Sequence, residues 1–163
     1  ALREAIKENN ILQEQQQQLE MQSTLRTAVY MLETIRNYAS RRNSLQSQYE
    51  SMKRDSRSAK GETLATLRRI MNTAEQGLEQ FRTGIDRSLS FYRTRVEEAA
   101  RLDKDDFERA LAGLLKDYAG EDLFNENMRR NAELLRQHVQ NERAGKLPAG
   151  RAMLQEILET RSK

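Results

Sequence analysis

The chain has 163 residues, 28 Lys or Arg, 25 Asp or Glu and a formal net charge of +3, a length that fits one domain or one domain with an appendage. Charged residues make up 33% of it, Trp is absent and Pro occurs once, which is typical of long exposed helices rather than a thick globular core. The lack of cysteine excludes disulfides and thiolate metal sites, and no stretch approaches the 18 apolar residues of a membrane span. These features leave the cellular compartment open.

Residues 1–20 are predicted to form a polar, Gln-rich helical extension. Six polar residues in succession, Gln13 to Gln18, leave no face of this stretch apolar, although Gln and Glu favour helix. We therefore expect the extension to be exposed, or paired through only Ile6, Leu12 and Leu19.

Residues 21–102 are predicted to form a long helical hairpin with its turn near residues 58–62. Gly61 suits the position that follows the first helix, and Ser58 or Thr63 is expected to cap the second. A short turn between two long amphipathic helices favours an antiparallel pair. The apolar stripe of the first helix is interrupted by Arg42 and consists of Leu25, Ala28, Leu32, Ile35, Tyr38, Ala39, Leu45, Tyr49 and Met52.

The second helix of the hairpin carries the more regular pattern. Its apolar residues alternate steps of three and four, as a coiled-coil seam requires. Gly77 and Gly84 lie seven residues apart beside this seam. They indicate either a close approach of the partner helix or a locally soft helix. We expect assembly to depend on the seam residues Leu64, Leu67, Met71, Leu78, Phe81 and Ile85.

Residues 103–163 are predicted to be a short-helix region with a Gly/Pro hinge at residues 145–150. One helix is expected to start with Asp105 as N-cap and to bury Phe107, Leu111, Leu114, Leu115 and Tyr118. A second is expected from about Asp122, with Phe124, Met128, Ala132, Leu135 and Val139 inward, and a third presents Met153, Leu154, Ile157 and Leu158. The predicted fold is all-α, a long antiparallel, coiled-coil-like hairpin with these short C-terminal helices packed on it.

Residues suited to catalysis or metal binding are sparse. The single histidine, His138, has Glu142 one helical turn later, but two ligands are too few for a metal site. No glycine-rich phosphate-binding loop and no nucleophile elbow occurs. We expect no catalytic residue, no metal, no cofactor and no small-molecule substrate, and therefore not an enzyme.

Basic residues gather at the predicted hairpin turn. Residues 36–70 hold nine basic and three acidic side chains, a local charge of +6. Basic groups near the end of a helix also complement its dipole, but this leaves Arg68 and Arg69, near a helix start, unexplained. A surface of this kind within residues 41–69 is expected to attract an anionic membrane or nucleic acid. We call this set the basic tip: Lys53, Arg54, Arg57, Lys60, Arg68 and Arg69.

One short motif lies next to the basic tip. Arg41, Arg42, Asn43 and Ser44 match the substrate pattern of basophilic kinases, so Ser44 is a candidate phosphorylation site.

Taken together, the sequence predicts a structural, scaffolding helical module that mediates protein–protein assembly through coiled-coil contacts. Its partner is either a second copy or another protein, giving a homo- or hetero-oligomer. The alternative is a peripheral membrane- or nucleic-acid-binding module that uses the basic tip.

Overall fold

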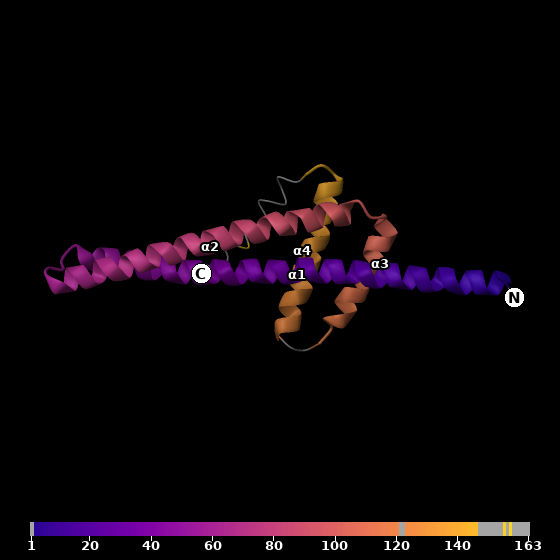
Figure 1. Ribbon diagram of the computed structural model, residues 1–163, viewed down its shortest axis with the longest axis horizontal. Coiled ribbons are helices and arrows are strands. Elements are labelled where there is room, and N and C mark those ends of the chain that lie inside the picture. The colour runs from indigo at the N-terminus through magenta and orange to yellow at the C-terminus, as the bar shows by residue number, and fades with distance from the viewer. Residues whose placement is uncertain (1, 121–122, 147–154, 156, 158–163) are drawn as a thin grey trace. The chain divides into compact units, whose positions relative to one another are not determined.

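The computed structural model describes residues 2–120, 123–146, 155 and 157, and this part of the chain is all-α (Figure 1). Its four helices are α1 (Leu2–Ser56), α2 (Glu62–Ala100), α3 (Lys104–Asp117) and α4 (Leu123–Arg143). None of the described helices is long and apolar enough to span a membrane. The predicted hinge beyond Lys146, with Pro148, and most of the predicted last helix lie outside the described residues, although Ile157 is buried.

Contacts divide the chain into two compact units. Unit 1 comprises residues 1–33 and 92–150, and unit 2 comprises residues 34–91 and 151–163. Both long helices therefore contribute to both units. The boundaries predicted from the sequence, at residues 20 and 102, rest on turn signals and on changes in polarity. The two units are instead defined by which residues pack together.

Unit 2 is built on the helical hairpin. The ring of Tyr38 on α1 lies 6.3 Å, centroid to centroid, from that of Phe81 on α2. Farther along α1, the hydroxyl of Tyr49 donates a hydrogen bond to Glu75 of α2 at 2.6 Å. Residue numbers rise on one helix as they fall on the other, so the two helices are antiparallel, as predicted.

The turn of the hairpin spans residues 57–61 and corrects the predicted caps. Gly61 has a positive φ of 65°, and its carbonyl accepts a hydrogen bond from the Ala65 amide at 3.1 Å. It therefore occupies the N-cap of α2 rather than the position after α1. The Ser58 hydroxyl donates back to the Asp55 carbonyl, and Thr63 lies inside α2, so neither caps that helix.

The two glycines beside the seam lie under side chains of α1. A Cβ placed on Gly77 would be 2.9 Å from Cδ2 of Leu45, and one on Gly84 would be 3.4 Å from the Tyr38 ring. The structure thus favours the close-approach interpretation of these glycines.

Unit 1 has an apolar core to which all four helices contribute. Arg26 of α1 also pairs with Asp117 of α3 at 2.8 Å. At Gly113 of α3, an added Cβ would be 2.5 Å from the Gln22 side chain of α1, so these two helices approach closely. The core consists of Leu25, Ala28, Val29, Leu32, Tyr92, Val96, Ala99, Phe107, Ala110, Leu111, Leu114, Tyr118, Met128, Ala132, Leu135 and Val139.

Two predictions for the short helices were wrong. The N-cap of α3 is Asp103, not Asp105, because the Asp103 carboxylate accepts hydrogen bonds from the backbone amides of Asp105 and Asp106. Phe124, expected inward, is 48% exposed and lies in the first turn of α4, one turn before the buried Met128.

The end of α2 is held by a residue of α4. The Arg143 guanidinium donates to the carbonyls of Ala100 at 3.2 Å and Leu102 at 2.9 Å, and lies 5.2 Å from the centroid of the Phe107 ring. Carbonyls at the end of a helix have no amide donor within that helix, and a cation is favoured at a helix C-terminus. Arg143 therefore acts as the C-terminal cap of α2.

Replacing Gly84 with alanine is expected to stabilise the chain by about 0.5–1 kcal/mol. Alanine costs less conformational entropy in a helix interior, and its Cβ would make ordinary contact with Tyr38. Gly77→Ala is the comparison and should gain less, because the Leu45 methyl must move. Chemical denaturation of the three proteins, followed by circular dichroism, measures this. A destabilised Gly84→Ala variant would contradict the observed spacing.

Candidate interaction surfaces

The predicted seam is only partly covered within the hairpin. Ile85 is 3% exposed, and Phe81 is half-buried near Tyr38. The four seam residues closer to the turn are all half-buried: Leu64, Leu67, Met71 and Leu78. Whether these residues support assembly stays a prediction, but the hairpin alone does not remove them from water.

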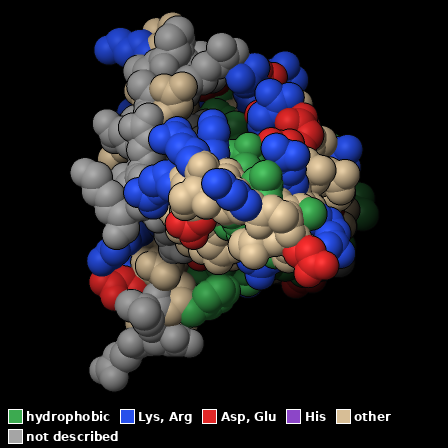
Figure 2. Space-filling view, turned by 90° about the vertical axis from the view of Figure 1, so that its left-hand side faces the viewer, with side chains coloured by type: hydrophobic (Ala, Val, Ile, Leu, Met, Phe, Trp, Pro, Cys, Tyr) green, Lys and Arg blue, Asp and Glu red, His purple; other side chains and the backbone are tan. Residues whose placement is uncertain are grey.

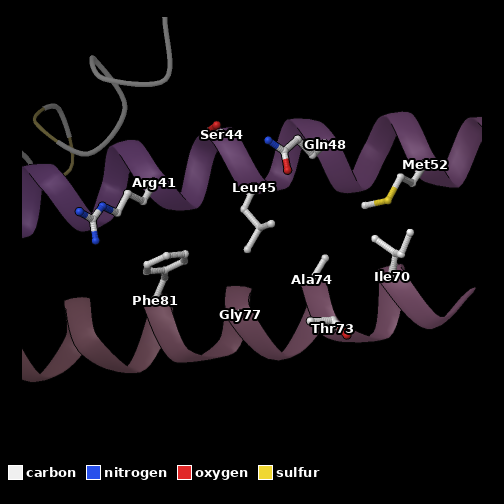
Figure 3. Close-up of a pocket in the computed structure, with 10 residues that line it drawn as sticks. All are labelled: Arg41, Ser44, Leu45, Gln48, Met52, Ile70, Thr73, Ala74, Gly77 and Phe81. Carbon is white, nitrogen blue, oxygen red and sulfur yellow. The ribbon is translucent and has the colours of Figure 1, made fainter. Parts of the chain in front are cut away.

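A groove of about 630 Å³ lies between the two helices of the hairpin. Figure 3 shows Leu45 of α1 and Phe81 of α2 pointing into the space between the helices, with Gly77 opposite Leu45. Ile70 at the same groove is 47% exposed. The remaining lining residues are Arg41, Ser44, Gln48, Met52, Thr73 and Ala74.

Ser44 lies on α1 at the edge of this groove. Its side chain is exposed, and Arg41, three residues earlier, is exposed as well. The motif therefore lies on an accessible surface of an unbroken helix. Phosphorylation of Ser44 stays a prediction.

The basic tip is exposed on both sides of the turn, and Figure 2 looks onto this end of the hairpin. Lys53 and Arg54 lie in the last turn of α1, where the helix dipole favours them. Arg68 and Arg69 lie in the second turn of α2, where it does not. Within the described part of the chain, none of the six cations forms an ion pair.

The N-terminal segment, residues 2–20 of α1, is helical as predicted and exposed almost throughout. Its large apolar side chains have exposed fractions near or above one half, in contrast to the buried residues that follow from Leu25. They are Leu2 (76%), Ile6 (53%), Ile11 (47%), Leu12 (63%) and Leu19 (66%). The part of the chain that the structure describes therefore covers α1 only sparsely before residue 20.

A buried polar pair lies in the core of unit 1. Tyr92 of α2 and His138 of α4 are 1% and 3% exposed, and the Tyr92 hydroxyl is 2.8 Å from Nδ1 of His138. Nε2 of His138 has no hydrogen-bond partner among the described residues. Burial lowers the pKa of His138 to about 4, and burial also raises the pKa of Tyr92 well above its ordinary value. The imidazole is therefore neutral at pH 7.

This pair lacks two features of a reactive centre. Side chains so deeply buried do not reach a substrate, and a general base needs hydrogen-bond distance to the proton it removes. Among the described residues, no three metal-binding side chains lie together. The sequence singled out His138 as the one histidine of the chain, but nothing in it indicated the partner, which is 46 residues away.

Comparison with protein-family models, with curated proteins and with solved structures finds no match to this chain. The surfaces therefore have to be interpreted from their own chemistry: a half-buried apolar groove, a set of exposed cations and an exposed helical segment.

The buried histidine predicts a pH dependence of stability. The unfolded chain binds a proton on His138 below about pH 6.5 and the folded chain only below about pH 4, so stability falls as pH drops through this window. Because each unit of pKa difference corresponds to about 1.4 kcal/mol, His138 is expected to lower the free energy of unfolding by up to about 3 kcal/mol at low pH. Denaturant titrations at pH 7 and pH 4 of the native chain and of His138→Gln measure it. Equal pH dependence in both proteins would show that His138 does not contribute.

Proposed function

We propose that this protein is a non-enzymatic scaffolding module that binds helices of protein partners through coiled-coil contacts. The observation that supports this is the incomplete burial of the hairpin seam, with a groove of about 630 Å³ between α1 and α2. Two antiparallel helices that leave apolar side chains exposed are stabilised when a third helix covers them.

The occupant that fits this groove is an amphipathic helix with an apolar stripe and acidic flanks. The apolar stripe would contact Leu45, Met52 and Ile70, which line the groove. We expect the flanks of this partner helix to be acidic, because residues 36–70 of the chain have a net charge of +6 and Arg41 lines the groove. Complementary charge raises the association rate and selects against basic partners.

Ile70→Asp is expected to weaken binding of such a helix at least tenfold. Burying one isoleucine contributes about 1.5–3 kcal/mol, and 1.4 kcal/mol is a factor of ten. The probes are two fluorescent peptides with the same leucine stripe, one flanked by Glu and one by Lys, measured by anisotropy. The matched control is Ile11→Asp, since Ile11 is also 47% exposed but lies outside the groove. Unchanged binding to Ile70→Asp, or preference for the Lys-flanked peptide, would overturn the proposal.

A second candidate function is binding of an anionic surface by the basic tip. It is favoured by the six exposed cations that form no ion pair in the described part of the chain. Arg68 and Arg69 support this function most, because they lie in the second turn of α2, where the helix dipole does not favour a cation. Each basic residue near an anionic bilayer contributes about 1 kcal/mol.

Reversing charge at Arg54 and Arg57 together, each to Glu, separates the two candidates. Binding to phosphatidylserine vesicles or to duplex DNA should fall at least tenfold at moderate salt if the tip binds phosphates, with the two ligands tested separately. Arg87→Glu with Arg93→Glu has the same net charge but lies outside the basic tip, and it should retain binding. Binding that is absent from the native chain, or equal in both double variants, rules out this function.

A further inference from the structure

We propose that the N-terminal segment forms a parallel, in-register, two-stranded coiled coil with a second copy of this chain. This goes beyond the proposed function, because the surface is separate from the hairpin groove and does not depend on it.

The segment contains a heptad pattern of its own. Positions 2, 5, 9, 12, 16 and 19 follow steps of three and four, which places them along one stripe of the helix. Four of these six residues are apolar, and the three leucines among them are 63–76% exposed. The stripe consists of Leu2, Ala5, Asn9, Leu12, Gln16 and Leu19.

This stripe lies on a different side of α1 from the buried core of unit 1. Leu25, Ala28 and Leu32 are each at most 1% exposed and define the core-facing side. At 100° per residue, the centre of the exposed stripe lies roughly 160° around the helix axis from theirs. The stripe is therefore not an extension of the face that the other helices of unit 1 cover.

The two polar residues of the stripe favour a second copy in parallel orientation. In a parallel, in-register pair each of these two positions, a in the heptad, meets the same residue of the other chain. Asn9 would meet Asn9 of the second copy and Gln16 would meet Gln16, and a side-chain amide both donates and accepts hydrogen bonds. In an antiparallel pair these amides would lie against leucine or alanine. A buried asparagine at this heptad position specifies register in two-stranded coiled coils.

The charges beside the stripe are compatible with the same arrangement. Across a parallel pair, Glu8 would lie near Gln13 of the second copy, and Gln15 near Glu20 of the second copy. Each carboxylate thus meets an amide that donates to it, and no like charges face each other. The remaining charged residues, Arg3, Glu4, Lys7 and Glu14, lie at outward heptad positions.

Single-cysteine variants test this directly, because the chain has no cysteine of its own. In the proposed pair the two Asn9 positions are close enough for a disulfide, whereas the two Lys7 positions point away from each other. Under mild oxidation Asn9→Cys is expected to give at least tenfold more disulfide-linked dimer than Lys7→Cys. Equal, low cross-linking of both variants would overturn the proposal. So would cross-linking found only in a mixture of Asn9→Cys with Leu12→Cys, which indicates an antiparallel pair.

Light scattering on the full chain provides the second measurement. The native chain is expected to have twice the monomer mass. The Leu12→Asp, Leu19→Asp variant is expected to have the monomer mass. A monomeric native chain at the concentrations of the cross-linking experiment would also overturn the proposal. The Glu-flanked peptide described above should still bind to the Leu12→Asp, Leu19→Asp variant. The Ile70→Asp variant should remain dimeric. Failure of the dimer and failure of the groove are thereby distinguished.

Discussion

Burial of one apolar stripe in the middle of α1 is the interaction on which both units depend. Between residues 25 and 39, every residue of this stripe except the half-buried Tyr38 is at most 1% exposed. Most helical stability in proteins comes from packing of such a face, so a 55-residue helix is stabilised chiefly over this stretch. Toward the hairpin turn this stripe becomes half-buried, and before residue 20 almost every residue of α1 is exposed. The groove and the N-terminal segment lie along these less covered stretches of the helix.

In unit 1, charged side chains satisfy backbone groups at two helix ends. Arg143 supplies donors to carbonyls at the end of α2, and the Asp103 carboxylate accepts from the first amides of α3. These two charged groups lie at the ends where the helix dipole favours them. They fix the short connection between α2 and α3, which in turn places Phe107 under the Arg143 guanidinium.

The sequence predicted those features that depend on period and composition. Steps of three and four residues gave the hairpin, and the glutamine run gave an exposed helical extension, because both reflect local burial along a helix. Features that join distant residues were not predictable. Nothing near His138 indicates Tyr92, and nothing near Gly113 indicates Gln22. The misplaced cap at Asp105 has another cause: several acidic residues compete at that helix start, and backbone geometry selects Asp103 among them.

Because the N-terminal segment is exposed, amide hydrogens along the single helix α1 are expected to exchange with solvent at very different rates. Amide hydrogens exchange with solvent through local opening, whose free energy is small where few apolar contacts exist. Amides before residue 20 in a single copy of the chain open as an isolated helix does, whereas those around Leu32 open only when the core itself does. One unbroken helix therefore contains a gradient of amide protection. Its position along α1 reports, residue by residue, where tertiary packing begins.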